Sequence, residues 1–232
     1  DATAISINAG VDMDMMSFGY VQYVKALVDE GKIKAETIDN AVRNILKLKF
    51  RLGLFENPYV DESLARQVAY APEHLAAAKQ SAVESAILLQ NNNDVLPLKS
   101  AKRILVTGPM ADAPYDQLGT WAFDGEEAYT VTPLTALRKD YDVVYEPALA
   151  YSRDASTAGI PAAVAAARSV DAVVAFVGEE AILSGEAHSL SQINLQGAQS
   201  ELIKALKATG KPVVDVVIAG RNLTIERDLE NC

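Results

Sequence analysis

The sequence is poor in the residues that bind metals or form disulfides. Among its 232 residues there are one cysteine, Cys232, and two histidines, His74 and His188. A single cysteine excludes an internal disulfide and leaves the redox compartment open. The scarcity of Cys and His argues against a metal site, and no glycine-rich nucleotide motif is present. We therefore expect neither a metal nor a cofactor.

The sequence also lacks an excess of positive charge and any long apolar run. Its 21 Lys and Arg residues face 31 Asp and Glu residues, a net charge of −10. Clustered Lys and Arg attract nucleic acids and anionic membranes, so neither is an expected partner. No apolar run approaches the ~20 residues of a membrane-spanning helix. Residues 1–15 lack the basic start of a signal peptide and resemble the middle of a longer protein, so this part of the sequence gives no information on targeting.

What is present is a globular composition, half hydrophobic and 22% charged, with the pattern of an α/β protein. Short apolar runs predict strands at 103–108, 142–145, 171–177 and 212–218, and residues 4–8 alternate like the end of a strand. Helical periodicity is found at 19–30, 35–51, 73–91, 159–169 and 196–209. Strands that are apolar on both faces and alternate with helices favour a buried, mostly parallel sheet with helices on both sides.

The same pattern predicts two unequal parts. Residues 1–55 hold too few elements for a core of their own, so they are expected to pack on something else. Residues 56–72, with Pro58 and Pro72, resemble a linker. Residues 73–232 make most of an open α/β domain.

Ligands bind beyond the carboxyl ends of parallel strands, and three segments leave such ends: 108–114, 178–188 and 219–222. The second is long and carries Glu179, Glu180, Glu186 and His188. A carboxyl group in such a loop can act as a general acid or base. The alternative is a solvated acidic loop.

Two other places hold candidate binding residues. Trp121, the only tryptophan, lies in a glycine-containing loop and could stack on a sugar or fill a domain interface. Asp12 and Asp14 would face the same side of a strand, and the neighbouring Met15 and Met16 suit either a pocket wall or a packed core.

Taken together, the segments resemble glycoside hydrolase family 3, the β-glucosidase-like exo-acting enzymes. The likeness covers nearly the whole chain, in the right order. It rests on 8–15 (the last barrel strand), 38–55 (the helix closing the first domain), 78–98 (the entry to the second domain), 104–112, 119–121, and 174–179 with the loop to Glu186.

The resemblance implies the end of an (α/β)8-type barrel in residues 1–55, followed by most of an α/β sandwich domain in 73–232, with the C-terminal part of that domain expected outside this chain. It implies a retaining mechanism with Glu186 as the general acid/base and Trp121 stacked on the leaving-group sugar. Asp14, Met15 and Met16 would line the barrel mouth, and His188 would lie beside the substrate. The family's nucleophile, an aspartate in a Ser-Asp motif, precedes the last barrel strand and is expected outside this chain.

We therefore expect a β-glucosidase that removes non-reducing terminal glucose from oligosaccharides or aryl glucosides, working with a barrel segment of the same protein and inactive without it. By resemblance, the location would be periplasmic or secreted. Many members follow the catalytic glutamate with Gly-x-Asp-Arg, whereas residues 187–192 read Ala-His-Ser-Leu-Ser-Gln. That departure keeps open a non-catalytic carbohydrate-binding or interaction module, and β-xylosidase activity is a further alternative.

Overall fold

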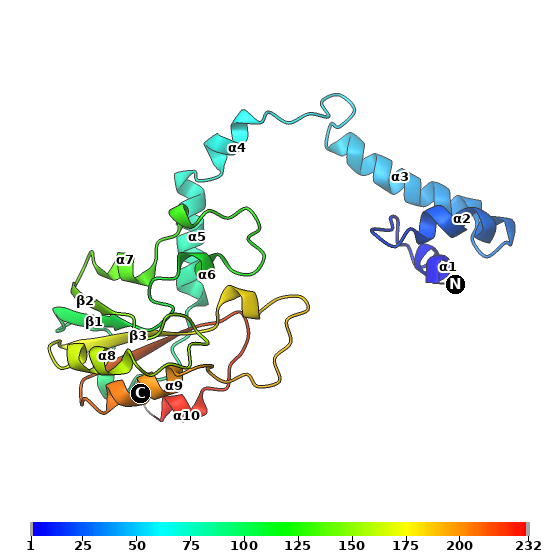
Figure 1. The fold of residues 1–232 in the computed structure, drawn as a ribbon. Coiled ribbons are helices and arrows are strands. Elements are labelled where there is room, and N and C mark those ends of the chain that lie inside the picture. The colour runs from blue at the N-terminus through cyan, green and yellow to red at the C-terminus, as the bar shows by residue number, and fades with distance from the viewer. Residues whose placement is uncertain (1, 231–232) are drawn as a thin grey trace. The chain divides into compact units, whose positions relative to one another are not determined.

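The computed structural model describes residues 2–230, except for the side chain of Arg66. The chain forms two compact units, residues 1–86 and 87–232 (Figure 1). Within the described residues, none of the helices combines the length and the apolar character that a membrane crossing requires.

The smaller unit is helical where it is described. Its helices are α1 (Ala2–Asn8), α2 (Gly19–Asp29), α3 (Ala35–Arg51), α4 (Ser63–Val68) and α5 (Pro72–Ser85). Ala4, Ile7, Leu27 and Ile33 are buried together and form a small core between α1, α2 and the start of α3. These four buried side chains form a small core inside residues 1–55, where too few elements were expected for a core of their own.

The strand expected at residues 4–8 is wrong, because this segment belongs to helix α1. Ala4 and Ile7 are three residues apart, so in a helix they lie on one face, and both are buried against α2. Residues 11–15 are not a strand either. In so short a segment, the same apolar residues satisfy both the alternation of a strand and the spacing of a helix, so periodicity cannot distinguish the two.

Helix α3 has the bounds expected from its periodicity. Glu36 lies in its first turn and Lys49 and Arg51 in its last, where they complement the helix dipole. Helix α5 ends at Ser85 rather than at 91, because the backbone turns to an extended conformation at Ala86. The segment expected as a linker contains the short helix α4.

The larger unit contains a parallel sheet of four strands in the order β2-β1-β3-β4 (Figure 1). The strands are β1 (Arg103–Thr107), β2 (Asp142–Glu146), β3 (Ala172–Gly178) and β4 (Val213–Ile218), each within one residue of its expected bounds. All three strand pairs are parallel. The expected α/β class is confirmed.

Alternate residues of the strands pack into two apolar clusters, one on each face of the sheet. Leu105, Val173 and Ala175 pack against α8 (Ile160–Ala167) and α9 (Gln199–Lys207), two helices that were expected. The other face holds Ile104, Val106 and Val174, packed on Met110 and on Leu134 of α7 (Pro133–Leu137). A strand buried on both faces is what the continuous apolar run of β3 predicts.

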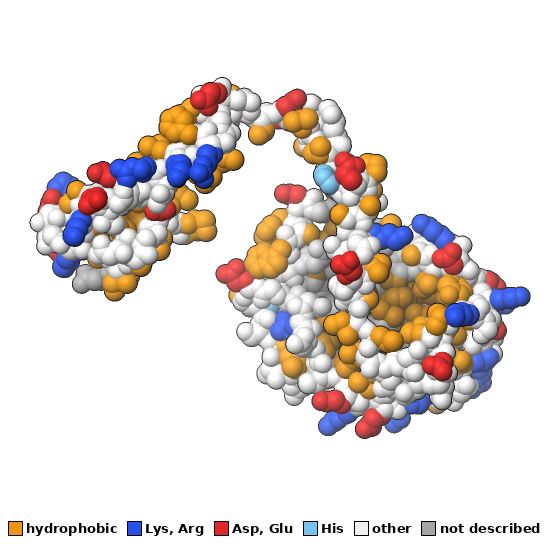
Figure 2. Space-filling model, turned by 180° about the vertical axis from the view of Figure 1, so that it is seen from behind, with side chains coloured by type: hydrophobic (Ala, Val, Ile, Leu, Met, Phe, Trp, Pro, Cys, Tyr) orange, Lys and Arg blue, Asp and Glu red, His pale blue; other side chains and the backbone are white. Residues whose placement is uncertain are grey.

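The second face is covered less completely. Several apolar side chains of β2 and β4 are only partly buried there, among them Val143, Tyr145, Val214 and Val216. On the side seen in Figure 2, hydrophobic side chains gather over a hollow of the larger unit, while Lys, Arg, Asp and Glu are interspersed around it.

The remaining elements are short and lie mostly in loops. They are η1 (Asn92–Asp94), α6 (Pro114–Leu118), η2 (Glu127–Tyr129), η3 (Ala181–Leu183) and α10 (Glu226–Leu229). After β1 the chain continues to β2, which pairs with one edge of β1, and β3 pairs with the opposite edge. The chain therefore changes direction between the carboxyl ends of β1 and β3, the place where open α/β sheets hold their ligands.

Candidate active site

Two loops meet at this edge of the larger unit. One follows β1 and carries α6, Thr120 and Trp121; the other follows β3 and carries η3, Glu186 and His188. Helix α6 packs on η3. Strand order alone therefore brings together Trp121 and the loop of Glu186, although 65 residues separate the two in the chain.

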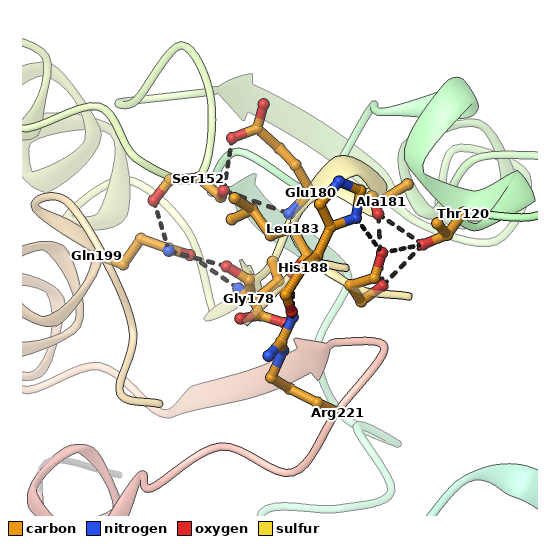
Figure 3. Close-up of polar contacts among 11 residues, drawn as sticks. Thr120, Ser152, Gly178, Glu180, Ala181, Leu183, His188, Gln199 and Arg221 are labelled. Atoms are coloured by element: carbon orange, nitrogen blue, oxygen red, sulfur yellow. Dashed lines mark hydrogen bonds and ion pairs between the residues drawn. The ribbon is translucent and has the colours of Figure 1, made fainter. Parts of the chain in front are cut away.

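The β3 loop starts from a fixed point at Gly178. The buried side chain of Gln199 accepts from the Gly178 amide at 2.8 Å and donates to the Gly178 carbonyl at 2.9 Å. Nε2 of Gln199 also donates to the Ser152 carbonyl at 2.7 Å (Figure 3). One neutral side chain thus satisfies both backbone groups at the end of the strand.

The first two glutamates of the loop are engaged in ion pairs. Glu179 is buried and accepts from Nε of Arg221 at 3.1 Å. Glu180 accepts from the Ser152 hydroxyl at 2.7 Å and from Nε of Arg153 at 3.1 Å. Burial opposes the charge on Glu180, but the bonds from Arg153 and Ser152 outweigh it and lower the pKa of this carboxyl.

Asp116 on α6 binds the backbone of Ala181, the residue after Glu180. Its Oδ1 accepts from the Ala181 amide at 2.8 Å. Burial and the nearby charge of Glu180 raise the pKa of Asp116, although the bond from Ala181 acts in the opposite direction. This aspartate therefore joins the β1 loop to the β3 loop through a backbone contact.

Thr120 makes a second connection between the two loops. Its hydroxyl lies 2.6 Å from the Ala181 carbonyl, 3.0 Å from the Ser184 carbonyl and 2.8 Å from the Ser184 hydroxyl (Figure 3). A hydroxyl has one proton, so it donates to one of these oxygens at a time. Because Trp121 follows Thr120 directly, this contact also fixes the backbone beside Trp121.

The backbone around Ser184 is closely packed. Gly185 has φ +100°, and a Cβ there would come within 2.6 Å of Cγ2 of Thr120. A Cβ at Gly220, after β4, would come within 2.7 Å of Cβ of Ser184. Ala187 also has a positive φ of 63°, an uncommon conformation for a residue with a side chain. The loop therefore has a defined, tightly turned course on both sides of Glu186.

Glu186 itself is exposed, and within residues 2–230 its side chain has no hydrogen bond or ion pair. It differs in this from Glu179 and Glu180, whose carboxylates are occupied by arginines. Of the three glutamates of the loop, Glu186 alone presents a carboxyl group that a ligand could reach without breaking an ion pair. That availability is what a proton-transfer residue requires.

The other expected site residues of the larger unit lie on the same two loops. Trp121 is 58% exposed and contacts Phe123 edge-on, with ring centroids 5.9 Å apart. His188 is exposed, and its Nδ1 lies 3.0 Å from the Ser184 carbonyl. An indole that is exposed on one face can stack on a sugar ring.

Asp14, Met15 and Met16 belong to the smaller unit. Asp14 accepts from Ser17 at 2.6 Å and from the Tyr20 amide at 3.3 Å. The Ser17 bond is the main reason that the pKa of Asp14 is lowered. Met15 and Met16 are 81% and 86% exposed. The expected pairing of Asp12 with Asp14 on a strand is wrong, since Asp12 instead accepts from Asn44 at 3.1 Å.

The sequence did not predict the residues that hold the loop. Asp116 and Gln199 lie in none of the segments that carried the resemblance, and Thr120 lies in one of them, 119–121, without a role for its own side chain. Arg221 lies in one of the three segments that leave strand ends, but its position there gives no role to its side chain. Only the packing of the loops reveals these four contacts.

Comparison with known proteins gives a consistent result. Residues 86–232 match the family model "Glycosyl hydrolase family 3 C-terminal domain". The chain is 34% identical to a periplasmic β-glucosidase of Salmonella typhimurium, over 98% of this chain and 34% of that protein. It is 32% identical to a β-xylosidase of Formosa agariphila, over 100% of this chain and 34% of that protein.

Solved structures agree with the sequence comparison. A mutant β-glucosidase from Listeria innocua, crystallised with laminaribiose, superposes with a TM-score of 0.87 at 36% identity. The match covers 99% of this chain and 32% of that enzyme. The chain thus spans about a third of the length of these relatives.

Proposed function

The chain belongs to glycoside hydrolase family 3, and from that membership we propose that it supplies the acid/base half of a retaining β-glucosidase active site. In this proposal Glu186 is the general acid/base, and the nucleophilic aspartate comes from a barrel in another segment of the same protein. Residues 1–55 would complete that barrel, 56–72 would be the linker, and 73–232 the sandwich domain.

The proposed chemistry has two steps. Glu186 gives its proton to the leaving oxygen while the bond from that oxygen to the anomeric carbon breaks and the aspartate bonds to the same carbon. The Glu186 carboxylate then takes a proton from water, whose oxygen displaces the aspartate and releases the sugar. Retention requires the two carboxyl groups to lie about 5–5.5 Å apart.

One observation carries the assignment. Glu186 is an exposed carboxylate without a partner among the described residues, in a loop whose neighbouring acids are both paired with arginines, at the switch point of the sheet. Trp121 on the adjoining loop supplies an exposed aromatic surface for the leaving-group sugar. Asp14, Met15, Met16 and His188 are proposed to line the pocket around the substrate.

The relatives bear on the sugar and on location. Laminaribiose in the Listeria innocua structure favours a β-linked glucosyl substrate, whereas the β-xylosidase of Formosa agariphila makes xylosides the second candidate. Relatives named periplasmic and lysosomal favour a site of action outside the cytoplasm. Rates on matched aryl β-glucosides and β-xylosides would decide between the two sugars.

The test is the Glu186→Ala change in the full-length protein, with hydrolysis of 4-nitrophenyl β-glucoside as the assay. We expect kcat to fall by about 10²–10⁴-fold, the usual contribution of a general acid or base. Added azide, which needs no general base, should restore turnover by forming the glucosyl azide.

The matched control is Glu201→Ala, which removes an exposed glutamate from helix α9. This variant should keep full activity. Undiminished hydrolysis by Glu186→Ala, with no response to azide, would show that another residue transfers the proton. A wild-type protein inactive on every glycoside but able to bind oligosaccharides would instead identify a carbohydrate-binding module.

A further inference from the structure

Glu186 lies in a loop whose two flanking carbonyls are held by one side chain. Nη2 of Arg221 donates to the Leu183 carbonyl, and also to the His188 carbonyl at 3.1 Å. These carbonyls lie three residues before and two residues after Glu186. Figure 3 shows the guanidinium of Arg221 directed at this part of the loop from the segment that follows β4.

The guanidinium of Arg221 is itself held in place by Glu179. Its Nε pairs with Glu179 at 3.1 Å, and the Glu179 side chain is only 2% exposed. The second carboxylate oxygen of Glu179 is buried and has no partner within the described residues. Arg221 is therefore the group that compensates this buried charge, and Glu179 in turn fixes the orientation of Arg221.

The arrangement depends on the shape of arginine. A planar guanidinium offers donors in several fixed directions, so it can serve a carboxylate and two carbonyls together. A lysine ammonium keeps the charge but presents it as a point without that geometry. Gly220 allows the approach, since a Cβ there would collide with Ser184 inside the loop.

We propose that Arg221 is a positioning residue for proton transfer, which fixes the backbone on both sides of Glu186 and so aims its carboxyl group. The proposal rests on the acid/base role proposed for Glu186. A buried ion pair adds little to stability compared with well-packed apolar residues, so this pair is better explained by the geometry that it imposes on the loop. Catalysis is sensitive to such geometry, because a misplacement of 1 Å can reduce a rate by about 10²-fold.

The experiment compares two substrates of the full-length enzyme that differ only in their need for an acid. The first step on 2,4-dinitrophenyl β-glucoside needs no proton donor, whereas the first step on phenyl β-glucoside does. For each variant, kcat/KM is measured on both substrates and expressed as the phenyl to dinitrophenyl ratio. A smaller folded fraction lowers both values equally, so the ratio is unaffected by a loss of stability.

For Arg221→Lys we expect the ratio to fall by about 10- to 100-fold, because only the acid-dependent substrate suffers from a misplaced carboxyl group. The control is Arg153→Lys, a change in the neighbouring Arg–Glu pair, in which Nε and Nη2 of Arg153 donate to Glu180 rather than to the loop carbonyls. Its ratio should equal that of the wild type.

A double variant, Glu179→Gln with Arg221→Met, separates positioning from charge compensation. It removes both charges of the pair, so recovery of the wild-type ratio would mean that Arg221 only neutralises Glu179, and would overturn the proposal. A ratio that stays low supports it.

A further variant distinguishes the positioning role of Arg221 from the acid/base role of Glu186 on which it rests. Glu186→Gln should itself lower the ratio. If it does and Arg221→Lys does not, the positioning role is wrong while the assignment of Glu186 stands. If Glu186→Gln leaves the ratio unchanged, the acid/base assignment fails.

Discussion

The hydroxyl of Thr120 offers a direct measure of how firmly the two loops are joined. Thr120→Val replaces it by a methyl group of similar size. The change leaves the Ala181 and Ser184 carbonyls and the Ser184 hydroxyl, 2.6, 3.0 and 2.8 Å away, facing an apolar group. Ala181 and Ser184 are both buried, so water reaches these oxygens poorly.

The magnitude follows from the number of protons. Thr120 donates one proton at a time, so one bond is lost rather than three, at a cost of about 1–3 kcal/mol for a buried group left unpaired. The Ser184 hydroxyl can turn to the Ala181 carbonyl at 3.4 Å, and His188 remains near the Ser184 carbonyl, which places the cost near the middle of that range. With a urea slope of about 2 kcal/mol/M, a loss of ~2 kcal/mol lowers the unfolding midpoint by about 1 M.

The assay is urea unfolding of the chain, followed by circular dichroism. Thr120→Ser keeps the hydroxyl and should lose much less. Thr157→Val, at an exposed threonine, should stay within about 0.5 kcal/mol of the wild type. If Thr120→Val is as stable as Thr157→Val, or no less stable than Thr120→Ser, the hydroxyl does not hold the loops together and the reasoning is refuted.

Two further changes test the beginning of the loop. Glu180→Gln should destabilise the protein at neutral pH. The pKa of Glu180 is lowered in the folded state, so its stabilisation is present above the usual value of 4.5 and is lost as the pH falls through the lowered pKa; unfolding curves of variant and wild type should therefore converge in acid. Gly178→Ala should prevent folding or shift β4, because its Cβ would come within 2.7 Å of the Ile218 carbonyl carbon. Gly210→Ala, also at a positive φ (73° against 139° at Gly178) but with open space around it, is the control in thermal unfolding.

The sheet was predictable because its strands are short, continuous apolar runs. Strand β3 is buried along its whole length, and such a run admits few other interpretations. The segment at 4–8 was not predictable, because its few apolar residues satisfy both periodicities and only the contact with Leu27 selects the helix.

The meeting of the two candidate loops at one edge of the sheet was predictable, but the contacts that hold them together were not. Strand order places the carboxyl ends of β1 and β3 together, so the loops of Trp121 and Glu186 could be expected at one edge. The choice of Glu186 among three glutamates came from family resemblance. Arg221 and Leu183 are 38 residues apart, and no local pattern shows that they meet.

The Gln199 amide gives the end of β3 a property that an ionisable residue would lack. It accepts from the Gly178 amide and donates to the Gly178 and Ser152 carbonyls at the same time. A carboxylate could not donate and an ammonium could not accept, whereas a primary amide does both at any pH. Acidification would thus remove the charge of Glu180, two residues farther along the chain, while leaving the hydrogen bonds at the strand end intact. The start of the β3 loop is therefore held by hydrogen bonds that do not depend on pH. At low pH the loop should loosen from Glu180 onward, while the sheet keeps its structure.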